Sequence, residues 1–412
     1  MQFSEFPFHK SILKAVAEER YHTPTLVQEQ AIPKVLAKKN VIVSAQTGTG
    51  KTAAFALPII QILFDKQGLK EEEGKEIKSL IVTPTRELAI QILENFKTYS
   101  KYTNLTTAAV FGGVSLEPQK DILAHGVDIL IATPGRLIDL YLQGFIDLSA
   151  IEIFVLDEAD LMLDMGFITD VKKIERLCPK KKQTLLFSAT IPEKIDDLAK
   201  TMLKKSVKIE INPEETTAKN IGQLLYYLPK KNKTDLCLHL LRNTINGKII
   251  IFRRTKIGVD KLEQTLLKND YDVVSIHGDK SQAIRNKAIE DFRNKKATIL
   301  IATDVAARGI DITNVDAIIN FDIPNIPETY VHRIGRTGRA GKSGIAFSFC
   351  SPDENSYIKT IEALIEKTIK IIVDHPYIIN KPKHKKLQPN TVSKNKKGRK
   401  SEASKKNKKR WY

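Results

Sequence analysis

Two adjacent carboxylates follow a short apolar run near the middle of the chain. Residues 153–156 read Ile-Phe-Val-Leu, and residues 157–160 read Asp-Glu-Ala-Asp. Such a run is typical of a buried strand in a parallel sheet, and open α/β sheets bind ligands beyond the carboxyl ends of their strands. Asp157 could hold Mg²⁺ there while Glu158 orients or deprotonates a water molecule. Acidic residues also end strands simply by facing solvent, so this interpretation depends on a phosphate site upstream.

A glycine-rich segment supplies that phosphate site. Residues 41–44 suit a strand, residues 53–57 suit a helix, and between them stand Ala45, Gln46, Thr47, Gly48, Thr49, Gly50, Lys51 and Thr52. In this context backbone N–H groups and the helix N-terminus bind phosphate, Lys51 reaches the β/γ-phosphates, and the Thr52 hydroxyl ligates Mg²⁺. The pattern G-x-x-x-x-G-K-[ST] fails at its first position, which is Ala45. A flexible loop before a helix is the alternative, but the remaining glycines, lysine and threonine favour nucleotide binding.

Length and composition exclude several classes of protein. The 412 residues suffice for two or three domains, and 42% of them are hydrophobic. No apolar stretch approaches the roughly 18 residues that span a bilayer, and the first residues lack the features of a signal peptide. Three cysteines stand far apart, without a C-x-x-C pair: Cys178, Cys237 and Cys350. We therefore expect no disulfide framework, no zinc site and no membrane partner, and a reducing cytoplasm is the simplest location.

The positive charge is concentrated at the C-terminus. The net charge is +18, and residues 381–410 hold 14 Lys/Arg against the single acid Glu402. This segment is nearly free of aliphatic residues, so it predicts a disordered tail. Nucleic-acid phosphates are the expected partner through salt-sensitive binding, with Trp411 and Tyr412 available to stack on bases. A solubilising tail and an anionic membrane surface are the alternatives.

Strand-like and helical stretches alternate along the rest of the chain, which predicts parallel α/β sheets. The expected strands are 41–44, 80–83, 107–111, 128–132, 151–156, 184–187, 248–252, 272–276, 297–302, 315–320 and 344–349. The expected helices include 85–97, 194–204, 257–268 and 281–293. Leu-Ile-Ala-Thr occurs at 130–133 and again at 300–303, in agreement with two similar halves. The predicted organisation is a first domain at 1–210, a polar linker at 211–220, a second domain at 221–372 and a tail at 373–412.

The second half carries an arginine cluster among glycines, at residues 332–339. Spacings of four and three place His332, Arg336 and Arg339 on one helical face, whereas Arg333 points elsewhere. Two arginines from a separate domain could stabilise the transition-state charge of a γ-phosphate. A helix with surface salt bridges is the alternative, although its two glycines would weaken it.

Together these motifs resemble those of the DEAD-box ATP-dependent RNA helicases. The resemblance covers the chain to about residue 370 and includes alanine at position 45. The further matching motifs are Pro-Thr-Arg-Glu-Leu-Ala at 84–89, Gly-Gly at 112–113, Thr-Pro-Gly-Arg at 133–136, Ser-Ala-Thr at 188–190, Gln-x-x-Arg at 282–285 and Ala-Thr-Asp-Val-Ala-Ala-Arg-Gly-Ile-Asp at 302–311. The resemblance implies two RecA-like domains, with Lys51, Asp157, Glu158, Arg336 and Arg339 as the catalytic residues.

The resemblance also implies that ATP is the nucleotide. The family's adenine-recognition segment, the Q motif, matches residues 1–29, where Phe3 packs on the base and the Gln28 amide donates and accepts at its edge. This sequence departs from the family pattern in having Leu26 and Val27 before Gln28 and Arg20 in place of a common glycine. Asp311 resembles the ligand of the ATP ribose. An aromatic residue that caps the first helix is the alternative interpretation of Phe3.

By the same resemblance, a path for RNA crosses both domains. On the first domain it comprises Arg86, Gly113, Thr133, Gly135 and Arg136, and on the second Thr255, Gln282, Arg285 and Thr303. Hydroxyls, arginines and backbone N–H groups recognise phosphate and sugar without reading sequence. Ser188 and Thr190 are expected to hydrogen-bond near Asp160 and His332, which would couple the nucleotide state to domain closure.

We therefore expect an RNA-dependent ATPase, monomeric in its core, that separates short RNA duplexes or remodels RNA–protein complexes. ATP, Mg²⁺ and RNA would close the two domains, and hydrolysis would reopen them. A translocating DNA helicase is one alternative, because RNA preference depends on 2′-OH contacts that the sequence does not display. A non-enzymatic RNA-annealing protein is another. A metabolic P-loop kinase is disfavoured, because a whole second domain carries the arginines.

Overall fold

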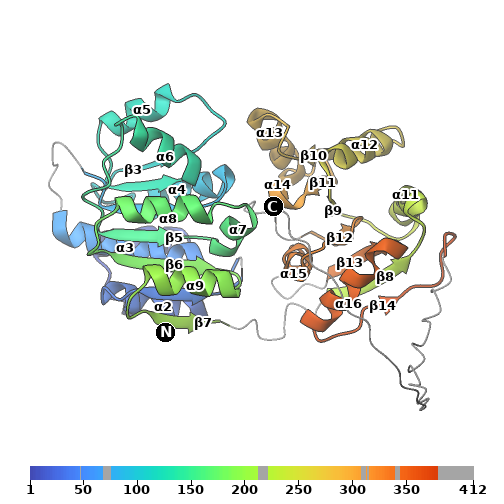
Figure 1. Cartoon of the computed structure of the whole chain (residues 1–412), viewed down its shortest axis with the longest axis horizontal. Helices are drawn as coiled ribbons and strands as arrows, with labels where there is room; N and C mark the ends of the chain where they lie inside the picture. The colour runs from blue at the N-terminus through green and yellow to red at the C-terminus, as the bar shows by residue number, and fades with distance from the viewer. Residues whose placement is uncertain are drawn as a thin grey trace, which may run out of the picture.

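The chain forms two seven-stranded sheets, each covered by helices on both faces (Figure 1). The computed structural model describes residues 1–46, 48–67, 76–211, 221–307, 312, 315–338 and 344–378. Within these residues every pairing between named strands is parallel. The predicted fold class, two tandem α/β domains built on parallel sheets, is confirmed.

The two sheets have the same strand order. From edge to edge, the first is β3 (Thr107–Val110), β4 (Ile129–Ala132), β2 (Ser79–Val82), β5 (Ile153–Leu156), β6 (Gln183–Ser188), β1 (Val41–Ser44) and β7 (Val207–Glu210). The second is β10 (Val273–Ile276), β11 (Ile299–Thr303), β9 (Ile249–Arg253), β12 (Ala317–Asn320), β13 (Gly344–Cys350), β8 (Ile221–Tyr227) and β14 (Lys370–Ile371). The Leu-Ile-Ala-Thr repeat falls on β4 and β11, which hold the same position in the two sheets.

Helices follow most strands in both domains. Those of the first are η1 (Phe3–Glu5), α1 (Lys10–Glu18), α2 (Leu26–Leu36), α3 (Lys51–Gln67), α4 (Arg86–Tyr99), α5 (Glu117–Ala124), α6 (Pro134–Leu142), α7 (Ala159–Asp164), α8 (Ile168–Leu177) and α9 (Glu193–Met202). Those of the second are η2 (Lys230–Asn232), α11 (Lys233–Asn243), α12 (Lys256–Leu267), α13 (Gln282–Arg293), α14 (Asp304–Ala307), α15 (Pro327–Ile334), η3 (Pro352–Glu354) and α16 (Asn355–Leu364).

Each sheet is buried on both faces, which explains its uninterrupted apolar strands. In β1, Val41 and Val43 pack into one hydrophobic core with α2 and α3, whereas Ile42 packs into a second core with α8 and α9. Successive side chains of a strand point to opposite faces, so both kinds of position must be apolar here. The edge strand β7 departs from this rule because its Lys208 and Glu210 are exposed. The sequence did not predict β7, β8 or β14.

The predicted domain ends need one correction. His375, assigned to the tail from the sequence, is buried, and its ring packs edge-on against Tyr226 with centroids 5.4 Å apart. Two rings of this segment, those of His375 and the partly buried Tyr377, therefore pack on the second domain, because they cover apolar residues near the edge of its sheet. The other predicted tail residues, 379–412, and all of the predicted linker except Ile211 lie outside the described residues.

A buried ion pair links three loops of the second domain. Lys233 is 1% exposed, and its Nζ lies 2.6 Å from Glu354 Oε2 and 2.9 Å from the Phe321 carbonyl oxygen. Glu354 also accepts a hydrogen bond from Arg254 at 3.0 Å. A buried charge is tolerated only when it is paired and hydrogen-bonded in this way.

We predict that Glu354→Ala strongly destabilises the second domain, because the buried Lys233 would lose its nearest carboxylate and keep only Asp322, at 3.8 Å. The expected loss is about 3–5 kcal/mol of unfolding free energy, measured by urea denaturation followed by circular dichroism. Glu210→Ala is the matched control, since Glu210 pairs with Lys208 at the surface and should cost less than about 1 kcal/mol. Equal losses in the two variants would contradict the prediction.

Candidate ATP site and RNA path

The glycine-rich segment forms the predicted turn between β1 and α3, and α3 begins at Lys51. Gly48 and Gly50 have φ angles of 87° and 90°, a left-handed conformation that glycine adopts without steric cost. A Cβ atom at Gly50 would also collide with the Gln28 amide. The Thr49 hydroxyl donates to the Gln46 carbonyl oxygen at 2.7 Å, whereas Thr47 lies outside the described residues. Glycine is thus required where the sequence placed the phosphate loop.

Lys51 lies among three carboxylates at the carboxyl end of the first sheet. Its Nζ is 3.0 Å from Glu158 Oε1, and both side chains are almost fully buried. Burial disfavours the charged form of Lys51, but Glu158, Asp157 and Asp160 outweigh burial and raise its pKa. Burial and the neighbouring Glu158 raise the pKa of Asp157 to about 7. The residues that follow β5 therefore bring the Lys51 ammonium group together with the carboxylates of Asp157, Glu158 and Asp160.

The backbone at Glu158 is strained. Its φ angle is 53°, in the left-handed region that a glutamate rarely adopts, and it caps α7. This conformation is compatible with the 3.0 Å contact between the Glu158 carboxylate and Lys51. The adjacent Asp157 is 3% exposed, and its Oδ1 has no hydrogen-bond partner among the described residues. Strained residues and unsatisfied buried atoms of this kind concentrate at functional sites.

Asp160, Ser188, Thr190 and His332 come together as the sequence predicted. The Thr190 hydroxyl and backbone N–H donate to Asp160 Oδ2 at 2.9 and 3.0 Å, and the Asp160 N–H donates to Ser188 Oγ at 3.1 Å. Burial raises the Asp160 pKa, but Lys51, His332 and these hydrogen bonds together hold it below its ordinary value. His332 belongs to the second domain, so the cluster joins the two domains.

The predicted adenine-recognition segment packs against the glycine-rich loop. Gln28 is buried, accepts a hydrogen bond from the Thr25 N–H at 2.9 Å and donates to the Gly50 carbonyl oxygen at 3.2 Å. Its amide keeps one further donor and one further acceptor position. Phe3 is buried against Tyr21, with ring centroids 6.1 Å apart, and Tyr21 itself is exposed. Arg20 has a φ of 58°, which gives the physical reason for the glycine common in the family.

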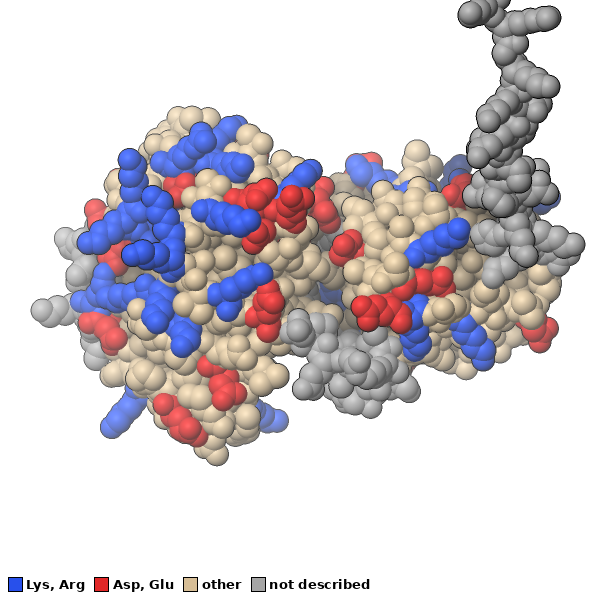
Figure 2. Space-filling view, turned by 60° about the horizontal axis from the view of Figure 1, so that its bottom comes forward, with Lys and Arg blue, Asp and Glu red and all other residues tan. Residues whose placement is uncertain are grey.

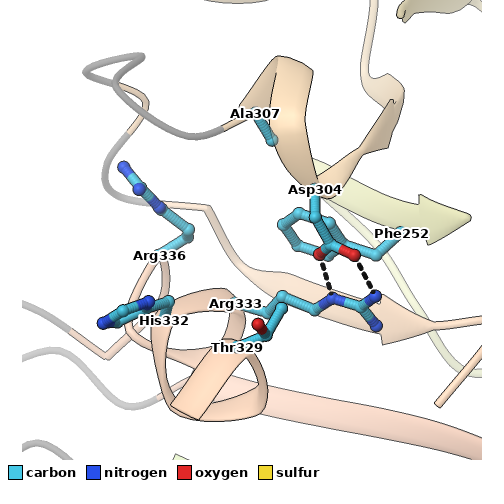
Figure 3. Close-up of a pocket in the computed structure, with 7 residues that line it drawn as sticks. All are labelled: Phe252, Asp304, Ala307, Thr329, His332, Arg333 and Arg336. Atoms are coloured by element: carbon cyan, nitrogen blue, oxygen red, sulfur yellow. Dashed lines mark hydrogen bonds and ion pairs between the residues drawn. The ribbon is translucent and has the colours of Figure 1, made fainter. Parts of the chain in front are cut away.

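The predicted helical face for the arginines is wrong. Helix α15 ends at Ile334 with Gly335 as its C-cap, so Arg336 lies in the turn that follows. Thr337 then forms a bridge with Val315, which pulls the chain out of helical conformation. His332 and Arg336 nevertheless project to the same side, away from the Arg333 guanidinium (Figure 3). Arg339 and Asp311 lie outside the described residues.

The sequence predicted that Arg333 points away from the nucleotide. In the structure its side chain stabilises the turn that carries Arg336. Its guanidinium makes two bonds to the Asp304 carboxylate, at 2.6 and 2.8 Å (Figure 3). It also donates to Asn320 Oδ1 at 3.1 Å and to the Asp322 carbonyl oxygen at 2.7 Å. These contacts join α14 and α15 to the end of β12. Both Asp304 and Arg333 line a pocket with His332 and Arg336.

The predicted RNA-path residues of the first domain end up beside one another. Arg86 Nη1 donates to the Gly113 carbonyl oxygen at 3.1 Å, and Gly113 has a φ of 79°. Arg136 Nη2 donates to the Val114 carbonyl oxygen at 3.0 Å, while its Nη1 has no hydrogen-bond partner in the described part of the chain. Thr133 is the N-cap of α6, and Gly135 is exposed with open space where a Cβ would stand.

Two of the four predicted RNA-path residues of the second domain, Gln282 and Arg285, contact the first domain. Arg86 Nη2 donates to Gln282 Oε1, and Arg285 Nη2 lies 2.9 Å from Glu87 Oε1. Thr255 caps α12. Thr303 ends β11 and corresponds, in the Leu-Ile-Ala-Thr repeat, to Thr133 directly after β4. The sequence did not single out Glu87 as a site residue. The only feature of the sequence that could have indicated a role for Glu87 is its position next to Arg86 in the motif at 84–89.

Family models match both domains. The model described as DEAD/DEAH box helicase matches residues 25–198, and the helicase conserved C-terminal domain matches residues 232–341. The DEAD-box ATP-dependent RNA helicase RhpA of Helicobacter pylori is 40% identical over 369 residues, which are 90% of this chain and 73% of that protein. The chain belongs to the DEAD-box ATP-dependent RNA helicases. It is accordingly an enzyme that uses ATP and acts on RNA.

Further relatives agree with this membership. The ATP-dependent RNA helicase CshA of Limosilactobacillus reuteri is 42% identical over 366 residues, 88% of this chain and 72% of that protein. RhlB of Shewanella piezotolerans is 40% identical over 372 residues, 90% of this chain and 85% of that protein. Among the described residues no helix is long and apolar enough to cross a membrane.

Solved structures of this helicase family confirm the two RecA-like domains. Saccharomyces cerevisiae Dbp5 bound to RNA and ADP BeF₃ matches with a TM-score of 0.79 at 31% identity, covering 90% of this chain and 95% of that one. A DEAD box protein from Methanococcus jannaschii is 38% identical, covers 90% and 99%, and has a TM-score of only 0.51. The higher TM-score thus belongs to the RNA-bound Dbp5, although its sequence is less similar to this chain.

We predict that Arg333→Lys slows ATP hydrolysis by this helicase while leaving ATP binding nearly intact. Lysine keeps the charge but cannot hold Asp304 with two parallel bonds, so the turn that carries Arg336 would shift. A shift of about 1 Å can cost about 100-fold in rate, and we expect a kcat reduced 10- to 100-fold with little change in the KM for ATP. Arg242→Lys, at an exposed arginine bonded to Asn269, is the control. A normal kcat for Arg333→Lys would contradict the positioning role.

Proposed function

We propose that this helicase works as an ATP-driven clamp whose catalytic residues are Lys51, Asp157, Glu158, Arg336 and Arg339. The supporting observation is the buried Lys51–Glu158 ion pair at 3.0 Å, directly at the phosphate loop. A triphosphate bound to the loop would compete for Lys51 and free the Glu158 carboxylate to accept a proton from water. The arginines of the second domain would then stabilise charge on the transferred phosphoryl group.

The nucleotide contacts follow the same assignment. We assign ATP binding to the loop residues 45–52, with Phe3 and Gln28 at the base. Asp311 is assigned to the ribose, and Arg336 and Arg339 to the γ-phosphate. The Gln28 amide supports this assignment, because it touches the loop at Gly50 while keeping one free donor and one free acceptor position.

Mg²⁺ fits the donors present beside the loop. The buried Asp157 Oδ1 lacks a hydrogen-bond partner among the described residues, as expected of an oxygen that faces a cation, and Thr52 follows Lys51 at the start of α3. Oxygen ligands of this kind suit Mg²⁺. Thr52 and Asp157 would hold the ion, which would neutralise phosphate charge. Glu158 would still accept the proton from the attacking water molecule.

RNA would lie along the carboxyl edges of both sheets. We assign its contacts to Arg86, Gly113, Thr133, Gly135 and Arg136 in the first domain, and to Thr255, Gln282, Arg285 and Thr303 in the second. The Arg86–Gln282 and Glu87–Arg285 contacts support the assignment, because they bring the two halves of the path together. The nucleotide state would be coupled to RNA binding on this path by Asp160, Ser188, Thr190 and His332. Closure over a bent strand would separate a short duplex locally.

The remaining parts would adapt the core to its RNA. We assign residues 1–210 and 221–372 to the two domains, with the packed segment reaching residue 378, and residues 211–220 to the linker. The basic C-terminal segment would tether structured RNA near the core and raise its effective concentration. A monomeric core that works in the cytoplasm accords with this scheme.

We predict that Glu158→Gln abolishes turnover but keeps ATP and RNA bound. Glutamine cannot accept the proton, so kcat should fall about 10²- to 10⁴-fold, while RNA affinity in the presence of ATP stays the same or rises. Multiple-turnover ATPase and RNA anisotropy measure the two effects. Glu152→Gln is the control, because Glu152 precedes β5 at the opposite edge and pairs with Lys66 at the surface. Repeated strand separation by Glu158→Gln would refute the clamp cycle.

We also predict that removing residues 381–412 weakens RNA binding without slowing the ATPase at saturating RNA. The truncated chain would lose 14 Lys/Arg, and the affinity for structured RNA should fall at least about tenfold, with a shallower salt dependence. Anisotropy at several salt concentrations measures both quantities. An unchanged salt dependence would show that these residues do not contact RNA.

A further inference from the structure

Three neighbouring turns of the first domain each carry two exposed lysines. They stand at the edge opposite the ATP site, where Lys38–Lys39 precede β1, Lys180–Lys181 precede β6, and Lys204–Lys205 precede β7. Because β1 pairs with both β6 and β7, and paired strands lie about 4.8 Å apart, the turns are side by side. We call these six residues the lysine edge.

Hydrogen bonds fix the three turns to one another. The Asn40 side chain donates to the Lys204 carbonyl oxygen at 2.9 Å and accepts from the Thr184 N–H at 2.8 Å. The Gln183 amide, which follows the second lysine pair closely, donates to the Lys39 carbonyl oxygen at 2.8 Å. The lysines therefore project from a rigid frame rather than from independent loops.

The charge of the lysine edge is not neutralised locally. Nearby carboxylates are already paired: Glu152 with Lys66, and Glu175 with Lys182. Within the described part of the chain, none of the six lysines has a carboxylate at ion-pair distance. Figure 2 shows basic side chains crowded at the end of the first domain that points away from the second domain. This end of the molecule is therefore a concentrated positive surface.

Two of these lysines occupy backbone positions that suit glycine or asparagine better. Lys38 has a φ of 55° and Lys205 a φ of 53°, and the left-handed conformation costs a residue with a side chain about 1–2 kcal/mol. Adjacent turns thus carry the same charged residue in the same strained conformation. Such repeated strain points to a role for the charge itself.

We propose that the lysine edge binds the phosphate backbone of an RNA segment that flanks the segment held at the catalytic edge. RNA is the polyanion on which this helicase acts, and lysines neutralise phosphates without reading bases. The exposed large apolar residues of the described chain lie outside these turns, so the edge lacks the apolar anchors of membrane-bound helices and protein hot spots. The four residues of β1 span about 13 Å, so different nucleotides occupy the two edges.

The test compares two charge-matched variants of the full chain. One carries Lys38→Gln, Lys39→Gln, Lys204→Gln and Lys205→Gln; the control replaces four exposed lysines of the second domain, namely Lys261, Lys268, Lys359 and Lys367, with glutamine. The probes are a short single-stranded RNA and the same strand joined to a hairpin, measured by anisotropy across a KCl series. We expect the first variant to lose about tenfold affinity for the hairpin RNA, with a shallower salt dependence. Its ATPase stimulation by the short strand, and both affinities of the control, should be unchanged.

Three results would overturn the proposal. Equal losses in both variants would show that net charge alone, and not the lysine edge, attracts RNA. Unchanged hairpin affinity in the first variant, together with lost binding to anionic phospholipid vesicles or to polyglutamate, would assign the edge to a membrane or to an acidic protein. Loss of ATPase stimulation by the short strand would indicate damage to the catalytic edge instead, and so would also count against it.

Discussion

The parallel direction of all strands is the constraint on which the rest of this structure depends. Parallel strands end at one edge of a sheet, so every loop that follows a strand lies on the same side. In the first domain this edge collects the phosphate loop, the Asp157–Glu158 pair and Ser188; in the second it collects Thr255 and Thr303. The strand order of the sheet determines which loops become neighbours, so the sequences of the covering helices can vary widely. Contacts such as Arg86 with Gln282 arise where the two edges meet.

The repeated strand order allows a comparison of the two edges. Lys51 is the first residue of the helix after β1, and Lys233 is the first residue of the helix after β8, the strand at the same place in the second sheet. Both lysines are buried and face a glutamate, Glu158 at 3.0 Å and Glu354 at 2.6 Å. Lys51 adjoins a glycine loop that can admit phosphate, whereas Lys233 is enclosed by the Phe321 carbonyl oxygen and the Glu354 carboxylate. The same frame thus gives the proposed ATP site in one domain and a structural ion pair in the other.

Structural features that are set by consecutive residues could be predicted from the sequence. Features that are set by tertiary contacts could not. Buried parallel strands are continuous apolar runs, and the phosphate loop is a contiguous motif, so both could be recognised from the sequence. Edge strand β7 alternates polar and apolar residues, and β8 contains glycine and glutamine, so neither shows such a run. Arg336 was wrongly placed on a helix because Gly335 and the Thr337–Val315 bridge stop the helix. The Glu87–Arg285 pair joins residues 198 positions apart, and no local pattern encodes it.

The proposed dependence of closure on ligands is consistent with the contacts between the domains. Beside the proposed nucleotide site, the charge of His332 helps to lower the pKa of Asp160. On the proposed RNA path, Arg285 Nη2 lies 2.9 Å from Glu87 Oε1. The Glu87 and Arg285 side chains are only 11% and 14% exposed, and the desolvation cost of a buried pair offsets much of its Coulombic attraction. These few contacts therefore contribute little net free energy toward holding the two domains together. In the proposed clamp, ATP and RNA would each bridge both edges, and each would therefore favour the closed arrangement. By linkage, each ligand would then raise the affinity for the other by the same factor.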